Sequence, residues 1–282
     1  MSESVVLPVS DSIVLNKLKL PTISEQGMKS LEIINAKDLK FNELESALSA
    51  DPMLTGILLK YANSPMYRKY VEITNVRKAI NLLGIDIVKS AILICTMRSY
   101  SEPSNPAKEM LWEKSIGLSI MTGHIARKAF RRVAEEIELC AMMSQIGGLV
   151  LSSNFVNDYA VVVEHSIEKN ITIEQAEFEA FGLHRADVTA FALGKLRLPK
   201  DIITALTMYY QGTTPVQIET KIDKHVATLR LASLLIEYKD DELAMKKNET
   251  VLFLIDILGL VESDLDDFID TYTEKVSENF SF

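Results

Sequence analysis

The feature that most constrains the fold is the spacing of the apolar residues, which recur every three or four positions through most of this 282-residue chain. This spacing places them along one face of an α-helix. The chain has no series of alternating β-branched runs bounded by turn pairs such as Asn-Gly, which would indicate strands and hairpins. The sequence therefore predicts an all-α protein.

Residues that begin and end helices support this prediction. Asp51 is a good N-cap for a helix over about 52–62, and Asn63, followed by Ser64-Pro65, is expected to end it. Asn75 begins a short helix that Gly84 ends, and Thr172 with Gln175 forms the pattern of a capping box. Further helices are expected at about 86–100, 109–131, 135–152, 156–169, 173–181, 185–196, 200–210, 221–239, 249–258 and 264–278.

The segment SEPSNPAK (101–108) holds the densest cluster of helix breakers, with two prolines in eight residues. We place a domain boundary there. The expected organisation is an N-terminal helical lobe over residues 1–104 and a second helical lobe over 105–282.

Composition and charge narrow the class of partner. The net charge is −9 and the pI is near 5.1, so the average surface repels a polyanion and makes nucleic acid an unlikely partner. Cys95 and Cys140 lie in apolar runs, which indicates buried thiols and not a disulfide or a metal site. There is no secretory signal and no apolar run of the roughly 18 residues that a membrane span needs. We expect a cytoplasmic protein without a membrane segment.

Several segments carry a family resemblance in the same order along the chain. They are LPTI (20–23), DPMLTGILLKYANSPMY (51–67), AINLLGIDIVKSAIL (79–93), Trp112 to Ser115, AMMSQIGGLVL, and FGLHRADVTAFALGKLRLPKDI onward to Ser233. Together they resemble the bacterial HDOD family over roughly residues 18–235. The resemblance implies an N-terminal helical lobe, a C-terminal lobe similar to HD hydrolases, and a non-catalytic role in signalling.

An HD hydrolase holds its divalent metals with histidine and carboxylate side chains. The resemblance places Ser144-Gln145 at the His-Asp pair and Lys114 at another histidine. It places Tyr209-Tyr210 at a later histidine and Ser233 at the last aspartate. His184 is the one residue of metal-site type that it retains, and one histidine does not hold a catalytic metal. We therefore expect no metal, no cofactor and no catalysis.

Two interpretations of these positions remain. The one we favour is that Ser144, Gln145, Tyr209 and Tyr210 fill the old cavity and bond to one another, since buried polar groups need partners. The other is that the cavity, now free of metal, binds a small ligand. The neighbouring Gly147-Gly148 indicates a close approach of two helices, or a kink.

Two charged segments are candidate partner surfaces. Arg127, Lys128, Arg131 and Arg132 form a basic patch whose arginines could grip a phosphate, as in a cyclic dinucleotide, although cations at the end of a helix have a sufficient structural cause. The acidic segment from Glu262 to Glu278 places Leu265, Phe268, Ile269 and Tyr272 at helical spacing, so we expect it to pack on one face.

The first functional hypothesis is a non-catalytic signal-transduction module that binds a protein partner or a small ligand such as a cyclic dinucleotide. The alternative is a residual metal-dependent phosphohydrolase that uses His184 with His165 and with Glu164 or Asp187. A third is a nucleic-acid regulator that acts through the basic patch. The sequence does not specify the oligomeric state.

Overall fold

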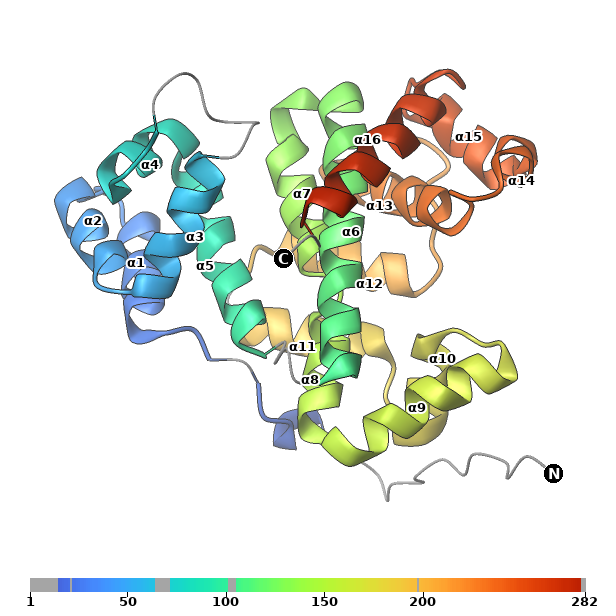
Figure 1. Ribbon diagram of the computed structural model, residues 1–282, viewed down its shortest axis with the longest axis horizontal. Helices are drawn as coiled ribbons and strands as arrows, with labels where there is room; N and C mark the ends of the chain where they lie inside the picture. Colours follow the sequence, from blue (N-terminus) through green and yellow to red (C-terminus); the bar gives the residue numbers. More distant parts are fainter. Residues whose placement is uncertain (1–14, 21, 64–71, 101–104, 197, 280–282) are drawn as a thin grey trace. The chain divides into compact units, whose positions relative to one another are not determined.

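The computed structural model describes residues 15–20, 22–63, 72–100, 105–196 and 198–279. Every regular element in these ranges is a helix, so the all-α prediction is confirmed (Figure 1). The chain forms two compact units, one over residues 21–100 and one that combines residues 101–282 with the first described segment, 15–20. The expected lobes, 1–104 and 105–282, differ from these units chiefly in where the segment 15–20 belongs.

The described residues of the smaller unit form five helices: α1 (Glu25–Asn35), α2 (Phe41–Ser49), α3 (Pro52–Ala62), α4 (Val76–Leu83) and α5 (Ile85–Tyr100). As predicted, the Asp51 carboxylate accepts from the backbone amides of Met53 and Leu54 at the start of α3. Gly84 ends α4 with a positive φ of 82°, a backbone conformation that glycine adopts readily. Leucines such as Leu44, Leu48, Leu54 and Leu58 form the core of this unit. The sequence did not predict α1 and α2, and Ser64-Pro65 lies outside the described residues.

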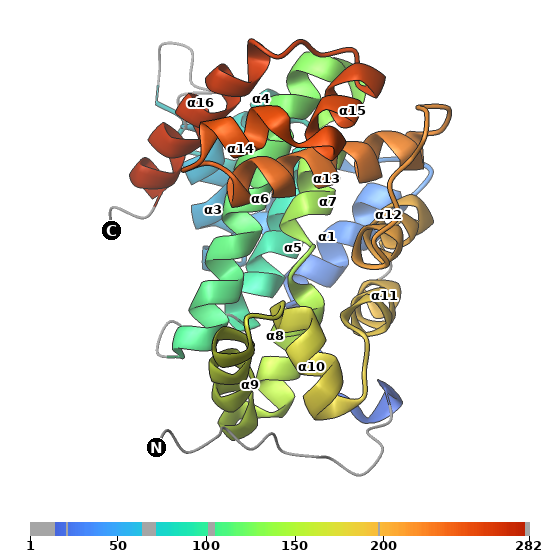
Figure 2. The ribbon, with the colours of Figure 1, turned by 90° about the vertical axis from the view of Figure 1, so that its right-hand side faces the viewer.

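The larger unit includes a short 3-10 helix, η1 (Leu15–Lys17), and its other described residues follow after residue 104. Its elements are α6 (Pro106–Ala129), η2 (Arg131–Val133), α7 (Ala134–Met142), α8 (Ile146–Asn154), α9 (Val156–Lys169), α10 (Ile173–Phe181), α11 (Arg185–Lys195), α12 (Lys200–Tyr210), α13 (Lys221–Glu237), α14 (Glu242–Lys247), α15 (Glu249–Ile257) and α16 (Asp264–Asn279). The long helix α6 contacts α7, α13 and α16, while α8 packs on α11 (Figures 1 and 2).

The predicted helix over 135–152 is wrong in one respect that matters for the site. It is two helices, α7 and α8, separated by a turn at residues 143–145. Backbone bonds in this turn run from Ser144 N to Ala141 O at 3.0 Å and from Ile146 N to Met143 O at 3.2 Å. The turn contains neither proline nor glycine, so local sequence does not mark it. Its effect is to bury both Ser144 and Gln145 in the interior.

The capping box predicted at Thr172 is only half present. Thr172 accepts from the backbone amide of Gln175, but the Gln175 side chain bonds to Glu179. A reciprocal box is present at the start of α13, where Thr220 and Asp223 bond each other's backbone amides. The ends of α9 and α10 follow the sequence closely because Asn170 and Gly182 adopt left-handed conformations.

The C-terminal helix packs as its apolar spacing predicts. Leu265 and Phe268 are fully buried, and Phe268 meets the ring of His124 on α6 edge to face. Tyr272 fits against Gly117, where an added Cβ would lie 2.9 Å from the tyrosine oxygen. α16 is therefore an integral part of the larger unit.

Both cysteines are buried free thiols, as predicted. Burial raises the pKa of Cys95 to about 12, which keeps this thiol protonated. No helix in the described ranges has the length and apolarity to cross a membrane.

Candidate functional site

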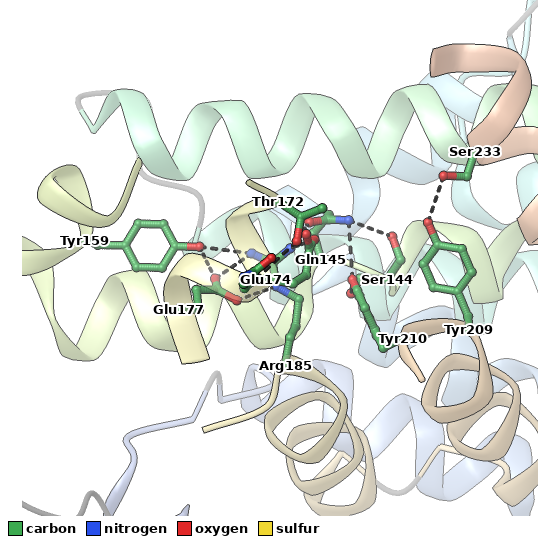
Figure 3. Close-up of polar contacts among 11 residues, drawn as sticks. Ser144, Gln145, Tyr159, Thr172, Glu174, Glu177, Arg185, Tyr209, Tyr210 and Ser233 are labelled. Atoms are coloured by element: carbon green, nitrogen blue, oxygen red, sulfur yellow. Dashed lines mark hydrogen bonds and ion pairs between the residues drawn. The ribbon is translucent and has the colours of Figure 1, made fainter. Parts of the chain in front are cut away.

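Ser144 and Gln145 lie in the turn between α7 and α8, where α12 approaches them. The Tyr210 hydroxyl donates to the backbone carbonyl of Ser144 at 2.6 Å. The Gln145 amide nitrogen lies 3.4 Å from both the Ser144 and the Tyr210 hydroxyl oxygens. These three positions, which the resemblance assigns to metal ligands, thus bond directly to one another (Figure 3).

The centre of this cluster is Arg185, the first residue of α11, which is 2% exposed. Its Nη1 donates to Gln145 Oε1 at 2.6 Å and to Glu174 Oε1 at 2.8 Å. Its Nε and Nη2 donate to the two oxygens of Glu177 at 2.7 and 2.5 Å, and Nη2 also lies 3.1 Å from the Tyr159 hydroxyl (Figure 3). An arginine has five N–H donors. All five therefore have an acceptor within the protein.

Two carboxylates, Glu174 and Glu177, face the Arg185 cation in this cluster. Burial alone would lower the pKa of Arg185, but Glu177 and Glu174 raise it well above its ordinary value. Burial raises the pKa of Tyr159, and the neighbouring Glu177 carboxylate, which accepts from the Tyr159 hydroxyl, raises it further. Arg185 is therefore a permanent cation and Tyr159 a neutral donor.

Gly147 and Gly148 allow α8 to approach α11 closely, as the sequence indicated. A Cβ on Gly147 would lie 2.4 Å from Thr189 Oγ1, and one on Gly148 would lie 2.9 Å from Arg185 Nη2. Larger residues at these two positions would displace the arginine or separate the helices.

A second pair of expected positions lies beside the Arg185 cluster. Tyr209 donates to Ser233 Oγ on α13 at 3.1 Å, and its ring meets that of Tyr210 at 5.2 Å (Figure 3). Arg230 lies 5.0 Å from the Tyr209 ring centroid and donates to the Tyr209 carbonyl at 2.5 Å. Burial raises the pKa of both tyrosines, so both stay neutral.

Lys114 on α6 marks the partly exposed edge of the cluster. Desolvation lowers the pKa of Lys114; Glu174 opposes this shift and Arg185 adds to it. The Glu174 side chain is about one-third exposed. Lys114, which the resemblance groups with Ser144, Gln145 and Tyr210, thus interacts electrostatically with the Arg185 cluster.

His184 is placed apart from the cluster, although it precedes Arg185. Its exposed ring stacks on Phe178 at 4.1 Å. His165, its expected partner in the hydrolase alternative, bonds to Glu179 at 3.0 Å. Within the described part of the chain, no three His, Cys, Asp or Glu residues gather as metal ligands.

The cluster does not fit the divalent metal of an HD-type centre. That metal needs imidazole and carboxylate donors that converge on one point. At the positions that the resemblance assigns to metal ligands, this chain presents a serine, an amide and a phenol, with a guanidinium 2.6 Å from the amide oxygen. A permanent cation at that distance repels a divalent ion.

The basic patch is divided by ion pairs. Arg127 bonds to Glu138 at 3.0 Å and Lys128 to Asp264 at 2.5 Å. Arg131 and Arg132 lie in η2 and are exposed. The four cations therefore do not form a single phosphate clamp.

Sequence reasoning missed Arg185, Glu177, Glu174 and Tyr159, which make the central contacts. The one available signal was Arg185 itself, a charged residue in the matched segment FGLHRAD beside apolar positions of the next helix. Its partners lie 8 to 40 positions away, a separation at which helical spacing carries no information.

Comparisons with known proteins agree with this fold. The profile of the HDOD domain matches residues 20–211, which leaves Ser233 outside the matched span. No curated protein sequence matches the chain.

Several solved structures share this fold. An HDOD domain protein of unknown function from Geobacter sulfurreducens superposes with a TM-score of 0.71 at 19% identity, covering 95% of this chain and 96% of that one. A Shewanella amazonensis protein provisionally named a metal-dependent phosphohydrolase gives 0.67 at 16%, covering 93% of each chain. A Marinobacter aquaeolei protein provisionally named for signal transduction gives 0.69 at 17%, covering 96% of this chain and 60% of that one. Identities this low establish a shared fold only. Because the HDOD profile matches more than half of the sequence, this chain belongs to the HDOD family.

Proposed function

We propose that this protein is a non-catalytic signal-transduction module of a bacterial cytoplasm, which regulates a protein partner by binding it. The observation that carries this proposal is the Arg185 cluster. A buried guanidinium bonds to Glu174, Glu177, Tyr159 and Gln145, and Gln145 is one of the positions that the family resemblance assigns to the metal ligands of an HD hydrolase. This arrangement supports the proposal because HD-type hydrolysis needs a metal-activated water, and a buried cation opposes metal binding.

A protein partner is better supported than a small ligand in the same cavity. Ser144, Gln145, Glu177 and Arg185 are all buried, and every N–H of Arg185 already has an acceptor. A phosphate that bound there would have to displace a carboxylate from the guanidinium. The names of two structural neighbours support a signalling role, since one refers to signal transduction and another, from Methylococcus capsulatus, to a response regulator, whereas the Shewanella amazonensis protein is named for phosphohydrolysis.

The proposed absence of catalysis is tested on the purified 282-residue chain. It is supplied in turn with Mn²⁺, Fe²⁺, Mg²⁺ and Zn²⁺ and given a phosphomonoester, a phosphodiester and a cyclic dinucleotide. The matched control is the double variant Ser144→Ala, Gln145→Ala. We expect the wild type to release no more product than this control. Metal-dependent turnover that the control lacks would refute the proposal.

The binding mode is tested by crosslinking in the native cell and rebuilding the complex from purified components. We expect a stoichiometric protein complex that forms equally well in EDTA. A rise in melting temperature with a cyclic dinucleotide, without any protein complex, would instead favour the small-ligand hypothesis.

A further inference from the structure

The Arg185 guanidinium lies in a chamber built by four helices. Gln145 comes from the start of α8, Tyr159 from α9, Glu174 and Glu177 from α10, and Arg185 itself enters from α11. Two carboxylates face one guanidinium, so without the arginine the walls of this chamber carry excess negative charge. Glu177 is fully buried and would then have no counter-charge from Arg185.

The shape of the chamber matches a flat cation. An added Cβ on Gly148 would lie 3.0 Å from Arg185 Cζ, so the absence of a side chain at Gly148 leaves room for the guanidinium. The Tyr210 ring centroid lies 6.0 Å from Cζ, at the limit of a cation–π contact. All three nitrogens of the Arg185 guanidinium donate hydrogen bonds to acceptors in the chamber.

We infer that this chamber is a binding site for a guanidinium-type cation, occupied in the wild type by the protein's own Arg185. The two Glu177 oxygens and the Gln145 oxygen are placed to accept hydrogen bonds from the planar, forked donors of a guanidinium group. An ammonium has three donors on one nitrogen, so lysine at position 185 is a poor substitute. Once the arginine side chain is removed, free guanidinium ion has the shape and charge to refill the chamber.

The test is chemical rescue of the Arg185→Ala variant. Thermal unfolding is measured in millimolar guanidinium chloride and in sodium chloride of equal ionic strength. Breaking a buried pair lowers Tm by about 10 °C. Guanidinium at about ten times its Kd should restore about 3 °C beyond the sodium control, and leave the wild type unchanged.

Arg77→Ala is the matched control. Arg77 also bonds to a glutamate and an amide, Glu45 and Asn42, but its side chain is 49% exposed. Water replaces an exposed guanidinium, so this variant should show no rescue. Equal responses of Arg185→Ala to guanidinium and sodium, or equal rescue of both variants, would overturn the cation site.

A second comparison applies if Arg185→Ala does not fold. The double variant Glu177→Leu, Arg185→Met replaces both charges by apolar groups and should unfold at a higher temperature than Glu177→Leu alone. A double variant that is no more stable than this single one would contradict the inference. The site is also independent of the proposed function: phosphohydrolysis by the wild type would refute that function and leave the rescue unaffected.

Discussion

Arg185 and Glu177 pair through two bonds, Nε to Oε2 at 2.7 Å and Nη2 to Oε1 at 2.5 Å, and neither side chain reaches the surface. A pair of this kind is costly to break from either side, because the remaining charge stays buried. The pair joins α10 to α11, and Gln145 extends the connection to α8. One guanidinium thus connects α8, α10 and α11 beside the positions that the family resemblance assigns to metal ligands.

Glu177→Gln should lower the free energy of unfolding by about 3–5 kcal/mol, because it leaves the Arg185 cation without its main counter-charge. Urea denaturation measures the change. Glu168→Gln, at an exposed position on α9, is the control and should stay within about 0.5 kcal/mol of the wild type. Equal small losses in both variants would show that the ion pair does not stabilise the fold.

Gly147→Ala should destabilise the protein by about 1–3 kcal/mol, because the new methyl would lie 2.4 Å from Thr189 Oγ1. Gly194→Ala on α11 is the matched control, since nothing lies within 4 Å of its added Cβ. Helix propensity should make that variant more stable by up to about 1 kcal/mol. Opposite signs in urea denaturation are expected, and a neutral Gly147→Ala would refute the close helix contact.

Much of the fold followed from local signals. The C-terminal end of α9 and both ends of α10 match the prediction because Asn170, Thr172 and Gly182 determine them. The turn between α7 and α8 did not follow, since Ser144 and Gln145 are compatible with a continuous helix. Tertiary bonds to Tyr210 and Arg185 hold the turn, and these partners are more than 35 positions away.

Only part of the candidate site could be predicted from the sequence, because its central contacts also join residues that are far apart in the chain. The family resemblance selected Ser144, Gln145 and Tyr210, which the structure brings together. It also selected His184, which stacks at the surface on Phe178, while the adjacent Arg185 makes the central contacts. Residue type alone does not reveal which of two neighbours points inward. That depends on where α11 begins.

Asn154, at the end of α8, holds the segment that precedes the smaller unit. Its side chain accepts from the Lys19 amide at 2.8 Å and donates to the Lys19 carbonyl at 2.9 Å. Asn154→Ala should release this segment and speed trypsin cleavage after the exposed residues Lys17 and Lys19. Asn157→Ala, at an exposed position on α9, should cleave at the wild-type rate. Unchanged cleavage in Asn154→Ala would show that other contacts hold the segment.

His225 should make stability depend on pH. Burial lowers the pKa of His225 below its ordinary value of 6.5, against the opposing effects of the Lys221 carbonyl and Glu136. Below pH 6.5 the unfolded chain therefore binds a proton that the folded chain does not, so stability is complete above this pH and declines below it. The wild type should lose stability more steeply than His225→Gln as the pH falls from 6.5. Parallel profiles would contradict this assignment.

The central claim is that the Arg185 cluster, and not a metal, occupies the site. It is tested most directly by measuring metal per chain in wild-type protein expressed with added manganese, iron and zinc and then purified without chelator. The account predicts well under one equivalent of any of these metals, unchanged in the Ser144→Ala, Gln145→Ala variant. One or more tightly bound equivalents, lost in that variant, would contradict it.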